Sequence, residues 1–361
     1  MNEFDEIRPY YDEELPQVFE ELIADPDFRR AVAVVLPDVP FDVWSQQMRS
    51  CRTKTEFQKT FCYGLLKHLM CQATAGTDID CSALTDRSKA YTYLSNHRDI
   101  VLDSGFLSVL LVEQGMDTVE IAIGDNLLIH PWIKKLVRVN KSFIVQRGQS
   151  IWIAQREGRA KDSDDRTQES VLKMMAMAGE GDVVDRLMEM NVVPTAISYE
   201  YDPCDYLKAR EFQLKRDCPD YRKSPADDLL NMQTGIFGYK GRVHFQVAPC
   251  INDQLALLPR TLPRSELFAR VAALIDRRIH AGYRLYPGNY VAADLLAAGT
   301  PRFASRYTPE QQQQFSRYID RQLQRIELPA KDEAFLRRKL LQMYANPLLN
   351  ALASGQNPLQ P

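Results

Sequence analysis

The segment from Asn96 to Asp103 carries residue types that can activate a hydroxyl group. It places His97 close to two carboxylates, Asp99 and Asp103. A neutral imidazole can take the proton of an attacking alcohol, while a carboxylate on its other ring nitrogen fixes the tautomer and stabilises the imidazolium. Either carboxylate could be this partner, and we favour Asp103 because it lies just inside the apolar run that follows.

A strand before this segment and a buried helix after it would position the histidine. Tyr91–Leu94 is aromatic and β-branched, the next two residues interrupt the pattern, and the apolar run 100–111 is typical of a buried helix. Open sheets commonly build ligand sites at such strand-to-helix junctions. The same spacing also fits a capped turn, in which Asn96 and Asp99 cap the helix and His97 is a surface residue.

The whole chain predicts an α/β fold, with a mixed, mostly parallel sheet covered by helices and helical regions at both termini. We expect an amino-terminal helical region over residues 1–88, an α/β core over 89–262 and a carboxy-terminal helical region over 263–361. The expected strands are Tyr91–Leu94, Val119–Ile123, Ser142–Val145, Ile151–Ala154, Val192–Tyr199 and Arg242–Val247. The expected helices after Arg264 are Glu266–His280, Pro309–Ile326 and Lys331–Leu352, with Thr308 and Asp332 as caps.

Composition narrows the class of protein. The 361 residues include 45 basic and 48 acidic ones, for a net charge of −3, and the absence of a long single-sign tract argues against nucleic acid as a partner. The seven cysteines form no C-x-x-C pair, so we expect reduced thiols and no metal cluster. The acidic amino terminus argues against a signal peptide, and no apolar run reaches the ~18 residues of a membrane span. We therefore expect a cytoplasmic protein.

Three further segments follow the first in order, and the four together span about 105 residues. The four segments are Asn96–Asp103, Gly124–Leu127 with Pro131 and Ser142–Arg147, Gln155–Lys161, and Val193–Glu200. They are similar to the H-x-x-x-x-D, G-D-N-L, E-G-x-R-S and V-P-x-x-I-x-Y blocks of the glycerolipid acyltransferase superfamily. The resemblance is to its glycerol-3-phosphate and dihydroxyacetone-phosphate acyltransferase branch in particular.

The resemblance implies a role for each matching residue. His97 would be the catalytic base and Asp103 its orienting partner. The residues implied in substrate binding are Gly124, Asp125, Asn126, Arg147, Glu157, Gly158, Arg159 and Lys161, with Arg159 on the acceptor phosphate and Pro194 structural at the site. A guanidinium fork matches phosphate oxygens, which suits that assignment. Without the family, these residues also fit turns, solvated loop charges and a strand start.

The chain departs from the family pattern at three places. Five residues separate His97 from Asp103 where the family has four, and no residue separates Gly158 from Arg159. Only Gly148, Gln149 and Ser150 join two strands that are parallel in the family, whereas a parallel crossover needs a dozen or more residues. This join predicts either an antiparallel hairpin or a lost crossover helix. In the second case the blocks need not converge on His97.

The resemblance therefore implies an O-acyltransferase of phospholipid biosynthesis. It would move a fatty acyl group from acyl-CoA or acyl carrier protein to glycerol 3-phosphate or 1-acylglycerol 3-phosphate, with no cofactor. Two alternatives stay open: another acceptor such as an aminolipid, or a catalytically impaired lipid-binding relative that lacks a crossover helix near Gly148. A membrane surface is a further expected partner, with the protein peripheral on its inner face. The candidate docking residues are Trp132, Ile133, Lys134 and Lys135.

Overall fold

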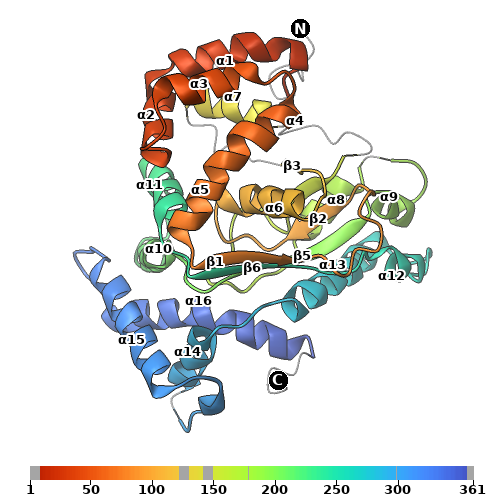
Figure 1. Cartoon of the computed structure of the whole chain (residues 1–361). Coiled ribbons are helices and arrows are strands. Elements are labelled where there is room, and N and C mark those ends of the chain that lie inside the picture. The colour runs from red at the N-terminus through yellow and green to blue at the C-terminus, as the bar shows by residue number, and fades with distance from the viewer. Residues whose placement is uncertain (1–8, 122–129, 141–148, 178, 298, 356–361) are drawn as a thin grey trace.

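The computed structural model of the chain describes residues 9–121, 130–140, 149–177, 179–297 and 299–355. Within them, strands form one sheet in the order β1-β6-β5-β2-β4-β3 (Figure 1). The strands are β1 (Gly76–Asp80), β2 (Thr92–Ser95), β3 (Glu120–Ile121), β4 (Ile151–Ala154), β5 (Val192–Tyr199) and β6 (Arg242–Val247). Neighbouring strands are parallel except β5 and β6, which are antiparallel. The predicted fold class, a mixed and mostly parallel sheet covered by helices, is confirmed.

Both faces of the sheet are covered by helices. All residues of β5 are buried, as a central strand between two helical layers requires. One layer holds α5 (Tyr63–Ala73) and α6 (Leu102–Glu113), whose apolar side chains pack with Val193 and Ile197 of β5. The helices of the other layer are α8 (Glu169–Met175), α9 (Val183–Glu189), α12 (Asn252–Ala256) and α13 (Arg264–Ala281).

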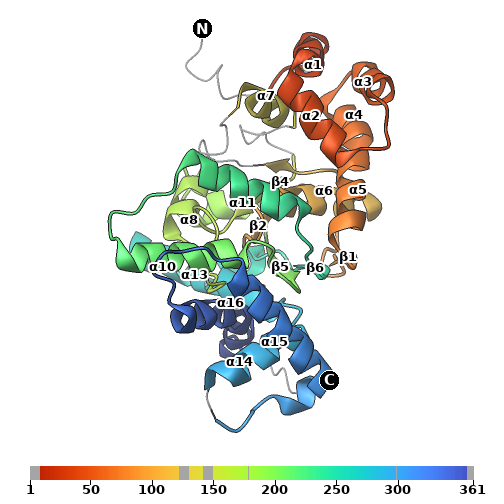
Figure 2. The same cartoon turned by 90° about the vertical axis from the view of Figure 1, so that its left-hand side faces the viewer.

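The amino-terminal helices form a separate apolar cluster at one end of the sheet (Figure 2). They are α1 (Leu15–Ala24), α2 (Pro26–Val35), α3 (Phe41–Ser50) and α4 (Lys54–Phe57), with a 3-10 turn at Asp12–Glu14 before them and a π turn at Gln58–Cys62 leading into α5. The Thr53 side chain caps α4, and the Asp25 side chain caps α2. Leu66 of α5 packs against both this cluster and the cluster on the sheet, so α5 connects the two.

Helix α7 (Pro131–Val139) joins the amino-terminal cluster although it comes much later in the chain. The Trp132 ring lies 5.8 Å from the Phe28 ring between centroids, and Lys135 Nζ lies 2.8 Å from a carboxylate oxygen of Glu21. Ile133 is buried. Three of the four residues proposed for membrane docking therefore make contacts inside the protein. No helix in the described ranges is both long and apolar enough to cross a bilayer.

The carboxy-terminal helices lie at the opposite end of the sheet (Figure 2). They are α14 (Pro287–Ala297), α15 (Pro309–Gln324) and α16 (Glu333–Ala353), with a 3-10 turn at Ala304–Arg306, and they pack against α10 (Asp205–Asp217). The predicted caps Thr308 and Asp332 are confirmed. The expectation of three helices after Arg264 was wrong, since α14 is a fourth. Its start, Pro287-Gly288-Asn289, has the composition of a turn.

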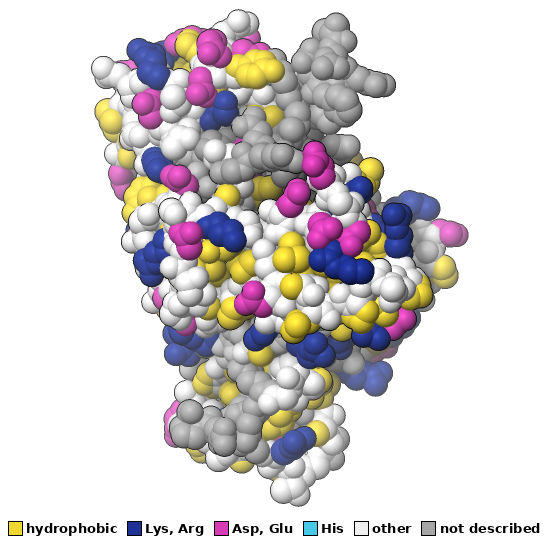
Figure 3. Space-filling view, turned by 90° about the vertical axis from the view of Figure 1, so that its right-hand side faces the viewer, with side chains coloured by type: hydrophobic (Ala, Val, Ile, Leu, Met, Phe, Trp, Pro, Cys, Tyr) yellow, Lys and Arg dark blue, Asp and Glu magenta, His cyan; other side chains and the backbone are white. Residues whose placement is uncertain are grey.

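Predicted strands and observed strands agree best in the core. β4, β5 and β6 begin and end at the predicted residues, and β2 is shifted by one residue. β1 was not predicted, because Gly76–Asp80 is polar and only half-buried, and it pairs with β6 alone. The predicted strand Ser142–Val145 lies outside the described residues. On the face shown in Figure 3, basic and acidic side chains are intermixed, in keeping with the small net charge.

A buried carboxylate, Asp205, links the carboxy-terminal helices to α10. Its Oδ2 accepts the hydroxyls of Tyr318 and Tyr344 at 2.7 Å each, and its Oδ1 accepts the Gln322 amide. Burial, together with the charge of Asp202, raises the pKa of Asp205 to about 7. The folded protein therefore holds a proton on Asp205 at mildly acidic pH.

We expect Asp205→Asn to gain stability relative to the wild type as the pH rises. The wild-type carboxyl ionises near pH 7 when folded but near 3.8 when unfolded, so its stabilising contribution is present at low pH and is lost as the pH rises through about 7. Asparagine does not ionise, so the difference in Tm between variant and wild type should move in favour of the variant by about 3 °C or more between pH 5 and pH 8. Differential scanning fluorimetry measures it. The exposed Asp320 of α15 supplies the control, since Asp320→Asn should give a similar Tm difference at both pH values.

Candidate active site

The Asp103 carboxylate is the centre of the candidate active site. It lies in the first turn of α6 and is fully buried. His97 Nδ1 is 2.9 Å from Asp103 Oδ2, and the same oxygen accepts the backbone N–H groups of Arg98 at 2.6 Å and Asp99 at 3.0 Å. The Tyr199 hydroxyl donates to Oδ1 at 2.9 Å. Four donors thus surround one buried carboxylate, as the burial of a charge requires.

Asp99, the other candidate partner of the histidine, has a different role in the structure. Its Oδ1 accepts the backbone N–H groups of Val101 and Leu102, each at 2.9 Å, and so supports the start of α6. The imidazole pairs with Asp103. One part of the capped-turn alternative is confirmed, because Asp99 accepts N–H groups at the start of α6. Its other two parts are wrong, since Asn96 bonds to Ile197 of β5 and His97 is a mostly buried residue paired with Asp103.

Asn96 and Trp152 fix the loop that carries His97. Asn96 Nδ2 donates to the carbonyl of Ile197 at 2.9 Å, and its Oδ1 accepts the N–H of the same residue at 2.7 Å, which ties the end of β2 to β5. The Trp152 ring stands edge-on to the imidazole with centroids 5.3 Å apart, and its Nε1 donates to Ser95 Oγ. With Nδ1 bound to Asp103, Nε2 is the imidazole nitrogen left for a ligand.

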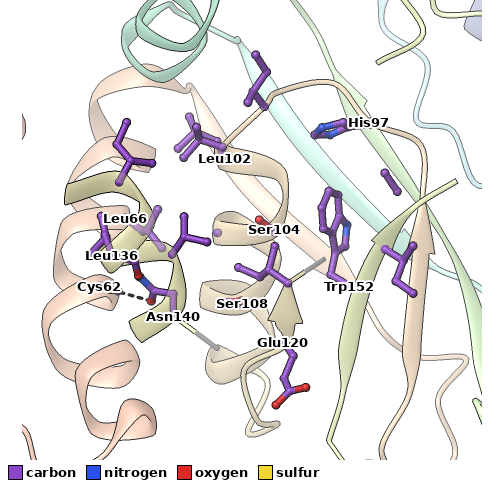
Figure 4. Close-up of a pocket in the computed structure, with 18 of the residues that line it drawn as sticks. Cys62, Leu66, His97, Leu102, Ser104, Ser108, Glu120, Leu136, Asn140 and Trp152 are labelled. Carbon is purple, nitrogen blue, oxygen red and sulfur yellow. Dashed lines mark hydrogen bonds between the residues drawn. The ribbon is translucent and has the colours of Figure 1, made fainter. Parts of the chain in front are cut away.

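His97 lines a cavity of about 2340 Å³. One wall is apolar and comes from α5, α6 and α7, where Leu66, Leu102 and Leu136 face the space (Figure 4). Pockets for small organic ligands usually measure roughly 300–1,000 Å³. This cavity is therefore large enough for a long apolar chain with its reactive end at His97.

The loop after β4 supplies a cationic wall to the same cavity. Arg156, Arg159 and Lys161 line it, together with Lys223. Arg159 Nη2 donates to Asn231 Oδ1 at 3.2 Å, whereas Arg159 Nη1 and Arg156 Nε are buried without a protein acceptor among the described residues. Buried guanidinium donors that lack an acceptor are costly, and an anionic oxygen satisfies them well.

Lys161 adds a positive charge whose strength depends on pH. It pairs with Glu211 of α10, whose carboxylate oxygens also lie 3.0 Å from Lys215 Nζ and 3.4 Å from Lys223 Nζ. Burial lowers the pKa of Lys161 to about 8, against the opposing effect of Glu211. Lys223 Nζ also lies 3.5 Å from Asp228 Oδ1. Two carboxylates for three lysines, beside Arg156 and Arg159, leave this wall positively charged at neutral pH.

The remaining residues of the third and fourth segments are placed as follows. Gly158 has a φ of 66°, in the left-handed region that favours glycine, and the loop turns there. Glu157 is exposed at the cavity, and its backbone N–H donates to Gln168 Oε1 at 2.7 Å. Pro194 is buried in β5, and its carbonyl accepts the N–H of Ala248, just beyond the end of β6. Pro194 has no backbone N–H to donate, and it lies just beyond the end of the β5–β6 hydrogen-bond ladder, where none is needed.

Four predicted residues, Gly124, Asp125, Asn126 and Arg147, lie outside the described residues. The short join from Gly148 to Ser150 leads into β4, which is parallel to β2 on one side and to β3 on the other. Both edges of β4 beside Ile151 and Trp152 are therefore occupied by parallel strands. The other strand of the predicted hairpin, Ser142–Val145, lies outside the described residues, so the choice between a hairpin and a lost crossover helix stays a prediction. The third segment does reach the cavity of His97.

Several site residues were not assigned from the sequence. Tyr199 ends the fourth segment, and its position in that block was the available signal. Trp152 lies in a predicted strand, where an aromatic residue is ordinary core. Asn231 and Lys223 come from α11 (Pro225–Phe237) and the loop before it, far from the four segments in the chain. Only the tertiary fold brings Lys223 to the cavity and Asn231 to Arg159.

Helix α11 is held against the histidine loop by a buried lysine. Lys240 is fully buried, and its Nζ donates to the carbonyls of Gly235 at 2.6 Å and Gly238 at 2.8 Å, at the carboxy-terminal end of the helix. A Cβ on Gly235 would lie 2.3 Å from Asp99 Oδ2. Only glycine at this position lets the helix approach Asp99 so closely.

Among known proteins, the chain has a distant likeness to a solved structure. No family model and no curated protein sequence matches the chain. Among solved structures, the chain is similar to the 1-acyl-sn-glycerophosphate (LPA) acyltransferase PlsC from Thermotoga maritima. The identity is 12%, the match covers 74% of this chain and 95% of that one, and the TM-score is 0.34. This likeness is too distant to support a functional argument, which therefore rests on the residues of the site.

We expect Gly235→Ala to destabilise the protein by about 2 kcal/mol, because the new methyl group must displace Asp99 from the start of α6. A matched control is Gly64→Ala in α5, where a Cβ meets nothing within 4 Å. That change should stabilise the helix by roughly 0.5 kcal/mol, since alanine is the better helix former. Urea unfolding of both variants measures the two values. Equal effects of the two substitutions would show that the contact between α11 and Asp99 is not tight.

Proposed function

We propose that this protein is a glycerolipid O-acyltransferase. It moves a fatty acyl group from a thioester donor, acyl-CoA or acyl carrier protein, to a hydroxyl of glycerol 3-phosphate or 1-acylglycerol 3-phosphate. The observation that carries this proposal is the His97–Asp103 dyad in a cavity with one apolar wall and one cationic wall. The dyad would act on the alcohol, the apolar wall would hold the acyl chain, and the cationic wall would bind the phosphate. The similarity of the four sequence segments to the family supports the same reaction.

The dyad performs the proton transfers of this reaction. His97 Nε2 accepts the proton of the acceptor hydroxyl as its oxygen attacks the thioester carbonyl carbon. Asp103 stabilises the imidazolium that forms and keeps the ring in the orientation that Nε2 needs. The tetrahedral intermediate then expels the thiolate, which takes the proton from the imidazolium. The ester and the free thiol are the products, and His97 returns to its neutral form.

The two walls of the cavity hold the two substrates on either side of His97. The apolar side chains of α5, α6 and α7 would take the acyl chain, whose transfer from water into such a site is favourable by about 0.8 kcal/mol per CH₂ group. Arg159, Arg156 and Lys161 would bind the acceptor phosphate through the donors described above. Because the products are lipids, we place the reaction at a membrane surface.

An assay with labelled acyl donors and a panel of acceptors tests this function. The panel includes glycerol 3-phosphate, dihydroxyacetone phosphate, 1-acylglycerol 3-phosphate and an N-acyl amino acid that lacks phosphate. Turnover of the phosphate acceptors supports the proposal. Turnover of the N-acyl amino acid alone would replace it with the aminolipid alternative. Absence of turnover with every acceptor would favour a lipid-binding protein without activity.

We expect His97→Ala and Asp103→Asn to lower kcat by about 10²–10⁴, the usual contribution of a positioned general base. The reason is that the first variant removes the base and the second removes the acceptor that fixes its tautomer. The control is His68→Ala, a histidine of α5 that the cavity does not include, which should keep full activity. Circular dichroism and Tm show whether each variant is folded. Retained activity in folded His97→Ala would exclude the dyad mechanism.

We expect the KM for the phosphate acceptor to rise as the pH passes through about 8. Above that pH Lys161 loses its charge, because burial has lowered its pKa, while the acceptor phosphate, with a second pKa of about 6, stays dianionic throughout. Lys161→Arg keeps its charge and should give a KM that is flat between pH 7 and 9. Initial rates at varied acceptor concentration give these values. A KM that rises equally in both proteins would assign the titration to another group.

A further inference from the structure

Two serines form a polar strip on the otherwise apolar wall of the cavity. Ser104 and Ser108 both line the cavity from α6, and their spacing of four residues puts them on one side of the helix, one turn apart. Figure 4 shows them between Leu66 and Leu136 on one side and Trp152 on the other. Most other residues of α6 are apolar and buried. The strip is therefore a specific feature of the wall that would face an acyl chain.

The Ser108 hydroxyl lacks a partner. Its Oγ is buried and makes no hydrogen bond to any described residue, including the backbone carbonyl one turn earlier that serines in helices commonly use. A buried hydroxyl without a partner is costly, and alanine at this position would avoid the cost. The position thus points to a hydrogen-bonding group on the ligand.

The neighbouring polar groups that line the cavity do not bond to Ser108. Trp152 Nε1 donates to Ser95 Oγ. Thr118 Oγ1 donates to Gln58 Oε1 at 2.7 Å, Gln58 Nε2 to the Asn140 carbonyl at 3.2 Å, and Cys62 Sγ to Asn140 Oδ1 at 3.2 Å. Glu120 also lines this part of the cavity (Figure 4) and has an interaction of its own.

We infer that the cavity selects an acyl chain that carries a hydroxyl group near its thioester end, such as a 3-hydroxyacyl group. This inference rests on the proposed function and adds the substrate class of the donor. A ligand hydroxyl both donates and accepts, so it can satisfy Ser104 or Ser108 in either direction. The reacting hydroxyl of the acceptor belongs at His97 and its phosphate at Arg159, which leaves the strip among the leucines to the chain.

The strip also sets where the chain hydroxyl belongs. Ser104 directly follows Asp103 in the first turn of α6, so it lies at the depth of the dyad. Ser108 is one turn further, about 6 Å along the helix at 1.5 Å per residue. A hydroxyl at the far end of a long chain would pass beyond both serines. The carbons nearest the thioester are therefore the ones in reach.

The test compares 3-hydroxypalmitoyl-CoA, 16-hydroxypalmitoyl-CoA and palmitoyl-CoA as donors with one acceptor. In the wild type we expect kcat/KM to be about five- to tenfold higher for the 3-hydroxy donor than for palmitoyl-CoA, the value of roughly one hydrogen bond, and no gain for the 16-hydroxy donor. In Ser104→Ala/Ser108→Ala the ratio should fall to about one. Ser50→Ala, an exposed serine at the end of α3, should keep the wild-type ratio.

A binding measurement separates this inference from the proposed function. Calorimetric titration of His97→Ala with the same three donors should show the same preference without any turnover, and the preference should disappear when both serines are also replaced. Absence of turnover in the wild type would refute the proposed function, while the titration would still decide the chain preference. Equal binding of the 3-hydroxy and unsubstituted donors, or a preference that survives the loss of both serines, overturns the inference.

Discussion

The burial of the Asp103 carboxylate is the constraint on which the rest of the site depends. A charge removed from water is stable only when hydrogen bonds replace its hydration, and here the donors come from two parts of the chain outside α6. The backbone of Arg98 and Asp99 and the ring of His97 belong to the preceding loop, while the Tyr199 hydroxyl comes from β5. The loop, the helix and the strand must therefore be assembled together before the carboxylate is satisfied. The dyad geometry is a consequence of that assembly.

A second buried charge pair connects the loop of His97 to the loop that supplies the cationic wall. Arg98 Nη2 lies 2.7 Å from Asp165 Oδ2, both side chains are buried, and the Tyr283 hydroxyl donates to the same carboxylate at 2.5 Å. Asp165 follows Lys161 closely in the chain, so the loop that bears Arg159 is tied to the residue after His97. Breaking a buried pair by removing one partner leaves an uncompensated charge. Arg98 therefore connects the loop of His97 to the loop that supplies the cationic wall. Its own side chain lines a second, smaller pocket and not the cavity of His97.

Particular residues show how far the sequence could predict this structure. β4 and β5 were predictable because strands buried on both faces read as mostly apolar runs, whereas β6 was predictable from its alternation of polar and apolar residues. The choice between Asp99 and Asp103 was less certain from spacing alone. Helix geometry explains why Asp103 is the partner of His97. Because α6 begins at Leu102 and side chains in the first turn tilt toward the amino terminus, the Asp103 carboxylate is directed back to His97. β1 was not predictable, because its polar residues form a strand only where β6 offers an edge. The same holds for Lys223, which the fold alone brings to the cavity, and for Asn231, which the fold alone brings to Arg159.

The position of the cavity follows from the way the apolar side chains divide. One cluster holds α1 to α4 with α7, another holds α5 and α6 on the sheet, and Leu66 contacts both. A space of this size inside a single core would be costly, at roughly 24 cal/mol per Å³ where packing is lost. Between two separately packed clusters, each core keeps its own contacts and the space can be filled by a ligand chain. A Cβ on Gly105 of α6 would lie 2.9 Å from a methyl carbon of Leu66, so α5 and α6 pack closely on the sheet side of the cavity. The amino-terminal helices therefore shield the apolar wall beside His97, which would face water without them.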